Sequence, residues 1–164
     1  MNKYNDVMSK LNEQIIKMNF DSALSIGLAL CINDIHYFSD YQKQNNISED
    51  IFSCFEQAVV NISKNKTDTD NYNFAPEYNK CSDFLENFFE EDNLLYDECV
   101  NLCSEILHLF DLIFTRDNKH IYEIIKLFYE NKEAHFQNNF DNSDELTDKL
   151  LNNMSNIDLL LFDM

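Results

Sequence analysis

The sequence predicts an all-α fold, arranged as a single-domain bundle of about six to seven helices. The 164-residue chain contains one Gly and one Pro, whereas an all-β domain needs a turn about every 8–12 residues, and turns depend on these two residues. Apolar residues recur at helical spacing along most of the chain, and no segment alternates long enough to predict a strand. Because 45% of the residues are apolar, we expect one core-forming domain over residues 1–164.

Three helices are predicted in the first third of the chain. The first covers residues 4–18, where apolar residues recur every three to four positions. A long second helix is expected to start at Asp21 and to continue to about residue 44. The third covers about residues 49–63, because Ser48 and the acids after it suit a helix N-terminus.

The segment 64–80 is predicted to be the one long loop, since it lacks periodicity and contains the only proline, Pro76. We expect aromatic residues within it (Tyr72, Phe74 and Tyr78) to attach it to the body. Four further helices are predicted over about residues 82–89, 94–114 and 119–136, and from residue 143 onward. The 94–114 helix is apolar around much of its circumference, which predicts a central position. The apolar tail 157–164 is expected to pack against the protein.

The composition excludes several classes of function. Gly27 is the only glycine, so neither a Gly-rich phosphate loop nor a dinucleotide-binding fingerprint is present. A net charge of −18 argues against binding to nucleic acids or to anionic membranes. No signal-peptide pattern is seen, and no apolar run reaches the roughly 18 residues of a membrane span. We therefore expect a cytoplasmic protein whose five cysteines are reduced and mostly buried.

No set of residues predicts an active site or a cofactor site. Glu105 and His108 form a Glu-x-x-His motif, but di-iron bundles need a second such motif, and residues 117–120 match it only partly. Cys99 and Cys103 supply only two of the four ligands of a zinc site. We therefore predict no catalytic residues, no metal site and no cofactor. A metal-dependent enzyme that uses Glu105 and His108 is the least favoured hypothesis.

Acidic residues are concentrated in one region. Residues 81–115 contain nine Asp or Glu, including Glu105 and Asp111, and no Lys or Arg. Such a region is either a solvated face or a docking face for a basic protein. The predicted partner-binding residues are Asp83, Glu86, Phe89, Glu90, Glu91, Asp92, Tyr96, Asp97 and Glu98, with Phe89 and Tyr96 as apolar anchors. Tyr37 and Tyr41 also lie near acids, either as surface contacts or as core residues.

Two segments, about a third of the chain together, resemble the YjaG-like bacterial family of small helical proteins, whose function is not established. Residues 20–41 are similar to that family's first long helix through Leu30, Cys31 and the aromatic residues that follow. The second segment, residues 96–107, resembles the family's Asp-x-Cys-Val-x-Leu-x-Ser stretch through Asp97, Cys99, Val100, Leu102 and Ser104. This chain lacks the Pro that commonly follows the family's first Cys. The resemblance implies an all-helical fold and carries no catalytic residue across.

By type, the chain also resembles immunity proteins of contact-dependent growth inhibition and other polymorphic toxin systems. The resemblance rests on small size, strong acidity and the lack of catalytic motifs. It implies a protein that is not an enzyme and that forms a 1:1 complex with a cognate basic toxin domain, often a nuclease, covering its active site. The alternative is a YjaG-like housekeeping protein, which would form a homodimer through an apolar helix face.

Overall fold

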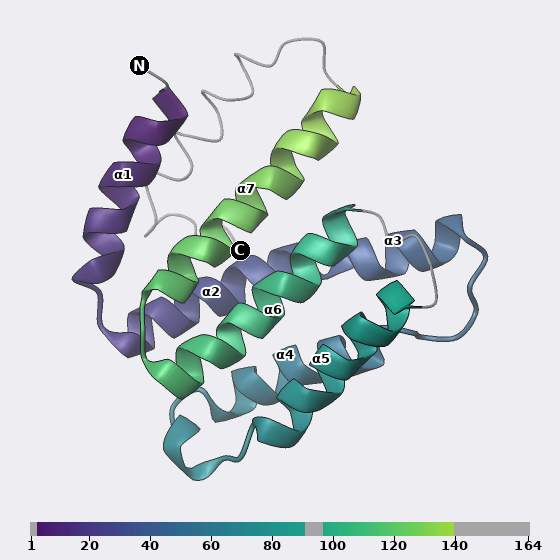
Figure 1. The fold of residues 1–164 in the computed structure, drawn as a ribbon, viewed down its shortest axis with the longest axis horizontal. Coiled ribbons are helices and arrows are strands. Elements are labelled where there is room, and N and C mark those ends of the chain that lie inside the picture. The colour runs from purple at the N-terminus through teal and green to yellow at the C-terminus, as the bar shows by residue number, and fades with distance from the viewer. Residues whose placement is uncertain (1–2, 91–96, 140–164) are drawn as a thin grey trace.

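The computed structural model describes the backbone of residues 3–90 and 97–139, and the side chains of residues 8–88 and 97–131. These residues form seven α-helices and one short 3-10 helix, with no strand among them (Figure 1). The helices are α1 (Lys3–Ile16), α2 (Phe20–Asp34), α3 (His36–Gln44), α4 (Ser53–Asn65), η1 (Thr69–Asn71), α5 (Ala75–Glu90), α6 (Asp97–Thr115) and α7 (Lys119–Asn139). The predicted all-α bundle is confirmed, whereas the helix predicted from residue 143 and the tail 157–164 lie outside the described residues.

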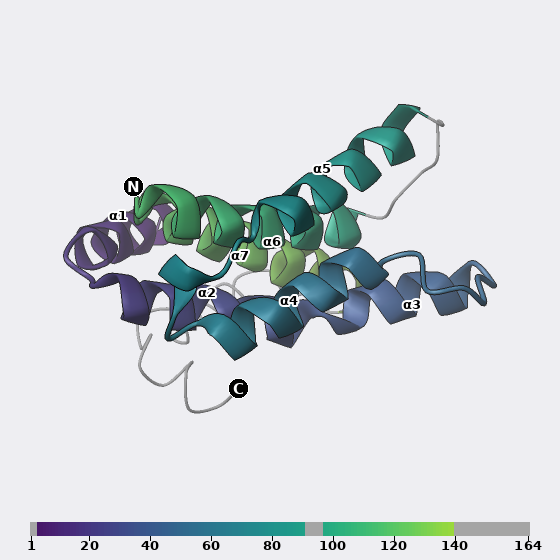
Figure 2. The same cartoon turned by 90° about the horizontal axis from the view of Figure 1, so that it is seen from below.

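Helix α6 occupies the centre of the bundle, as its apolar circumference predicts. It forms an antiparallel hairpin with α7, and it also contacts α2, α3, α4 and α5 (Figures 1 and 2). Leu102, Ile106, Leu109 and Phe110 of α6 are fully buried. Helix α2 crosses the α6–α7 hairpin, and α1 packs on α7. None of the described helices combines the length and the apolarity of a membrane-crossing segment.

The long helix predicted to continue to residue 44 is two helices, because the chain breaks at Ile35. The N–H of Ile35 donates to Ile32 O (3.3 Å), and the N–H of Phe38 donates to Ile35 O (3.3 Å). These i→i+3 bonds tighten the backbone at the junction of α2 and α3. The start of α2 also differs from the prediction, since Asn19 rather than Asp21 caps it through a 2.8 Å bond from the Ser22 N–H.

The segment 64–80 is only partly a loop, because α5 begins at Ala75. Pro76 therefore lies in the first turn of a helix, where its missing N–H costs no hydrogen bond. The helix predicted over residues 82–89 is the second half of α5. The attachment of this segment by its aromatic residues is confirmed, since Phe74 is buried against Phe110.

Helix α4 also starts later than predicted, at Ser53 rather than about residue 49. Asp50 lies just before the first turn, and its Oδ1 accepts a 3.2 Å hydrogen bond from the Phe52 N–H. Phe52 occupies the N-cap position, so Ser48 is not the cap. The side chain of Gln42 at the end of α3 accepts from the Ile51 N–H (3.1 Å), which fixes this connection to α3. The ring of Phe52 stacks on Phe38 with 4.3 Å between centroids.

Candidate protein-binding surface

One end of the molecule gathers carboxylates from four helices. Figures 1 and 2 both show α3, the start of α4, the C-terminal half of α5 and the start of α6 at this end. The carboxylates on these elements and on the α3–α4 connection, here named the acidic end, are Asp40, Glu49, Asp50, Glu56, Asp83, Glu86, Asp97 and Glu98. The same described elements carry two lysines, Lys43 and Lys80. The acidic end thus contains eight carboxylates and two lysines.

The opposite end of the described structure has a larger share of bases and is less acidic. Its bases lie at the ends of α1 and α4 and around the α6–α7 turn, and they are Lys17, Lys64, Lys66, Arg116 and Lys119. Eight acids lie on these and the neighbouring segments: Glu13, Asp21, Asp68, Asp70, Glu77, Asp111, Asp117 and Glu123. Arg116 pairs with Asp70 at 2.5 Å, and Lys119 pairs with Asp117 at 3.5 Å. The negative charge is therefore unequally distributed along the molecule.

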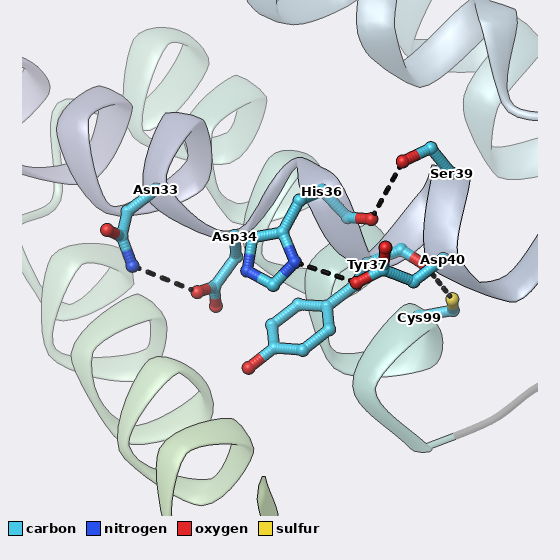
Figure 3. A network of polar contacts seen from close by, with 7 residues as sticks. All are labelled: Asn33, Asp34, His36, Tyr37, Ser39, Asp40 and Cys99. Atoms are coloured by element: carbon cyan, nitrogen blue, oxygen red, sulfur yellow. Dashed lines mark hydrogen bonds and ion pairs between the residues drawn. The ribbon is translucent and has the colours of Figure 1, made fainter.

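A network of polar contacts holds the α3 and α6 parts of the acidic end together (Figure 3). His36 Nδ1 lies 3.0 Å from Asp40 Oδ2 within α3, and the Cys99 thiol of α6 donates to the Tyr37 carbonyl at 3.4 Å. Burial, together with the charges of Glu98 and Asp40, raises the pKa of Cys99 to about 12. The same two carboxylates contribute to a raised pKa at Tyr37, again after burial. Carboxylates from α3 and α6 therefore affect the same two neighbouring side chains, Cys99 and Tyr37.

A second carboxylate pair lies where α4 begins. Burial, a hydrogen bond with Asp50 and the charge of Asp50 raise the pKa of Glu56 to about 7. Two carboxyl groups at hydrogen-bond distance cannot both ionise without repulsion. The acidic end is thus electrostatically strained near neutral pH, and a cation placed beside it would relieve that strain.

An open groove of about 580 Å³ runs between α4 and α5 within this end. Its lining includes Asp83, Lys80 and the half-buried ring of Phe84. That ring also packs against the rings of Phe52 and Phe55, and its centroid lies 5.8 Å from that of Phe88. The groove therefore offers an aromatic floor next to a carboxylate, a combination typical of protein-binding sites.

The groove also contains the Cys54 side chain, whose chemistry differs from that of the buried thiols. A hydrogen bond from Cys81 is the main cause that lowers the pKa of Cys54, and Lys80 adds to it. Cys81 itself is buried and lies 3.5 Å from the Cys54 carbonyl. All five cysteines are free and four are buried, which confirms the expectation that the thiols are mostly buried.

The structure describes only part of the predicted partner-binding set. Asp83, Glu86 and Asp97 are exposed and Glu98 is half-buried, and these four belong to the acidic end. Phe89 and Glu90 belong to the backbone of α5, but their side chains lie outside the described part of the structure, as do Glu91, Asp92 and Tyr96 entirely.

Some of the acids and tyrosines considered in the sequence analysis are buried and do not lie on the surface. Glu105 is fully buried, so it does not contribute to a docking face. Tyr37 and Tyr41 are 8% and 6% exposed, which makes them core residues and not surface contacts. Asp40, Glu49 and Asp50 join the acidic end although they lie more than 30 residues before Asp83 in the chain. Only the fold brings them there, so a linear count of charge does not find them.

Comparisons with known proteins do not assign the chain to a family. No protein-family model matches the sequence, no curated protein matches it, and no solved structure matches the fold.

Proposed function

We propose that the protein is an immunity protein, which binds a basic toxin domain through the acidic end and covers its active site in a 1:1 complex. The observation that supports this proposal is the asymmetry of charge, with eight carboxylates against two lysines at one end and eight carboxylates against five bases at the other. An active site that handles nucleic acid is rich in cations, because it must bind phosphate. A nuclease domain is therefore the partner that such a surface suits best.

The electrostatics favour fast association with a cationic partner. Like charges gathered on one face raise the local potential and steer an oppositely charged protein toward it. The raised pKa of Glu56 reports burial and the repulsion of a neighbouring carboxylate in the free protein. A basic partner replaces this repulsion by attraction, so complex formation is expected to weaken as salt is added.

The groove between α4 and α5 provides the non-polar part of the proposed interface. Carboxylates at a rim contribute mainly to rate and orientation, whereas buried aromatic contacts contribute most of the binding energy. Phe84 and Phe88 lie next to Asp83 and Glu86 on α5, so one helix presents both kinds of contact. The role is inhibition by binding and requires neither a catalytic residue nor a cofactor.

The test uses the protein encoded immediately upstream of this chain. We expect it to be basic and toxic when expressed alone, to lose its nuclease activity on addition of this chain, and to form a 1:1 complex whose Kd rises with salt. A neighbour that does not bind, together with a chain that forms only a homodimer, would contradict the proposal and favour the YjaG-like housekeeping alternative.

A further inference from the structure

A group of potential metal ligands lies on the α6–α7 hairpin, apart from the acidic end. His108 and Asp111 are three residues apart on α6, so their side chains lie on the same face of the helix. His120 belongs to the first turn of α7, and the hairpin brings it back against α6. Nδ1 of His108 lies 3.0 Å from Nδ1 of His120. One ligand atom from each of the three side chains lies within 4.8 Å of the other two.

We propose that His108, Asp111 and His120 form a binding site for a divalent first-row transition metal, with Zn²⁺ as the ion that fits best. Two imidazoles and one carboxylate are a ligand set that suits Zn²⁺. Zn–N bonds of about 2.0–2.1 Å place the ligand atoms of a tetrahedral site roughly 3.3 Å apart. The separations of these ligand atoms, 3.0 Å for the imidazoles and at most 4.8 Å for the whole group, need only small side-chain rotations to reach that value.

The surroundings of the three side chains also favour a cation. All three are half-buried, so the site excludes part of the solvent and still leaves a path for an ion to enter. The carboxylates of Asp111 and Glu123 are the acidic groups that act on the His108 ring. Lys119, the adjacent base, is paired with Asp117.

This site differs from the one that the sequence motif would indicate. Glu105 of the Glu-x-x-His motif is fully buried in the core and is not part of the group. The ligands are instead Asp111, on the other side of His108 along α6, and His120, which is twelve residues away in the chain. Three protein ligands leave the fourth tetrahedral position to water or to a group from another molecule.

The experiment is a titration of chelator-treated full-length protein with ZnCl₂ in a calorimeter, and with CoCl₂ by visible absorption. We expect one ion per chain, a rise in Tm, and Co²⁺ bands of a tetrahedral site. Because loss of even an outer-shell partner weakens metal binding by roughly 10- to 100-fold, His108→Gln and His120→Gln should each weaken it at least that much. Asp111→Asn should weaken Zn²⁺ binding and should keep the fold, as circular dichroism would check.

A histidine variant outside the group serves as the control. His36 is exposed on α3 and contacts Asp40, so His36→Gln should leave Zn²⁺ affinity unchanged. No binding of Zn²⁺ or Co²⁺ by the wild-type protein would overturn the proposal. So would binding that survives His108→Gln and His120→Gln, or binding that His36→Gln abolishes.

Discussion

Replacing Gly27 by Ala tests the packing at the centre of the bundle. Gly27 is buried in α2 where this helix crosses the α6–α7 hairpin. A Cβ at this position would lie 2.7 Å from Leu109 Cδ2, 2.8 Å from Ile121 Cδ1 and 3.2 Å from Ile124 Cδ1. Carbon atoms in favourable contact are about 3.5–4.0 Å apart, so the three side chains must move to admit one methyl group.

Two opposing effects determine how much Gly27→Ala changes the free energy of unfolding. Ala is better than Gly inside a helix by about 1 kcal/mol, whereas forcing an extra methyl into a packed core costs about 1–3 kcal/mol. The obstructing atoms are the ends of flexible side chains, but Leu109, Ile121 and Ile124 are all 0% exposed and have no solvent to move into. We therefore expect Gly27→Ala to lower the free energy of unfolding by about 1 kcal/mol, or Tm by about 2–4 °C for a chain of this size.

A double-mutant cycle in urea makes this prediction specific. Leu109→Ala alone should cost about 2–5 kcal/mol, because it leaves a cavity beside Gly27. In the double variant the methyl group introduced at position 27 enters that cavity, so the combined loss should be smaller than the sum by at least about 1 kcal/mol. Strict additivity would refute the packing described here, as would a Gly27→Ala variant stabilised by the full helix-propensity gain.

Two further substitutions test the electrostatics and the attachment of α1. With a folded pKa of about 7 and an ordinary value of 4.5, Glu56 holds more protons in the folded than in the unfolded state between these values, so stability falls as pH rises through that window. The full pKa shift would change the free energy of unfolding by about 3 kcal/mol. Because Glu56 is partly exposed, we expect a change of about 1 kcal/mol. Glu56→Gln should therefore stabilise the protein by that amount at pH 8 and hardly at pH 4, with Glu49→Gln as the exposed control; unfolding curves with the same pH dependence in wild type and Glu56→Gln would contradict this. Asn118 Nδ2 donates to Ile15 O at 2.8 Å and to Met18 O at 2.7 Å, so Asn118→Ala leaves two carbonyls at the end of α1 without these bonds and should cost about 1–3 kcal/mol. Hydrogen exchange should become faster in the variant than in the wild type for α1 amides, with a smaller change for α4 amides. Equal protection of α1 in the variant and the wild type would show that the Asn118 contacts do not stabilise α1.

The helices could be predicted because their burial is visible in the sequence, whereas their ends often could not. Helix α6 has apolar residues around most of its surface, and a helix of that kind must be central. Pro76 is equally compatible with a loop and with the first turn of a helix, and only the later residues of α5 decide between them. The break at Ile35 leaves the apolar periodicity intact on both sides, so the periodicity predicts one helix where there are two.

The residues of the candidate sites could likewise be predicted only in part from the sequence. The acids on α5 and α6 are neighbours in sequence and could be predicted as a group, but Asp40 and Asp50 join them only through the packing of α3 and α4. Glu105 counts as surface charge in a linear list although it is buried. His108 and His120 lie in different helices, and the α6–α7 turn that brings their rings together is a property of the fold. Sequence spacing identifies ligands on one helix and misses those that a hairpin supplies.

The most direct measurement of the central claim compares two triple variants that each remove three negative charges. Asp83→Asn/Glu86→Gln/Asp97→Asn changes carboxylates of the acidic end, and Glu13→Gln/Asp21→Asn/Glu130→Gln changes exposed carboxylates elsewhere. Three exposed ion pairs contribute about 1–3 kcal/mol together, which is roughly 10- to 100-fold in Kd. Binding to the protein encoded upstream, the partner proposed above, should weaken by that factor in the first variant and by less than about threefold in the second. Equal weakening in both, or none in the first, would contradict a binding surface at the acidic end.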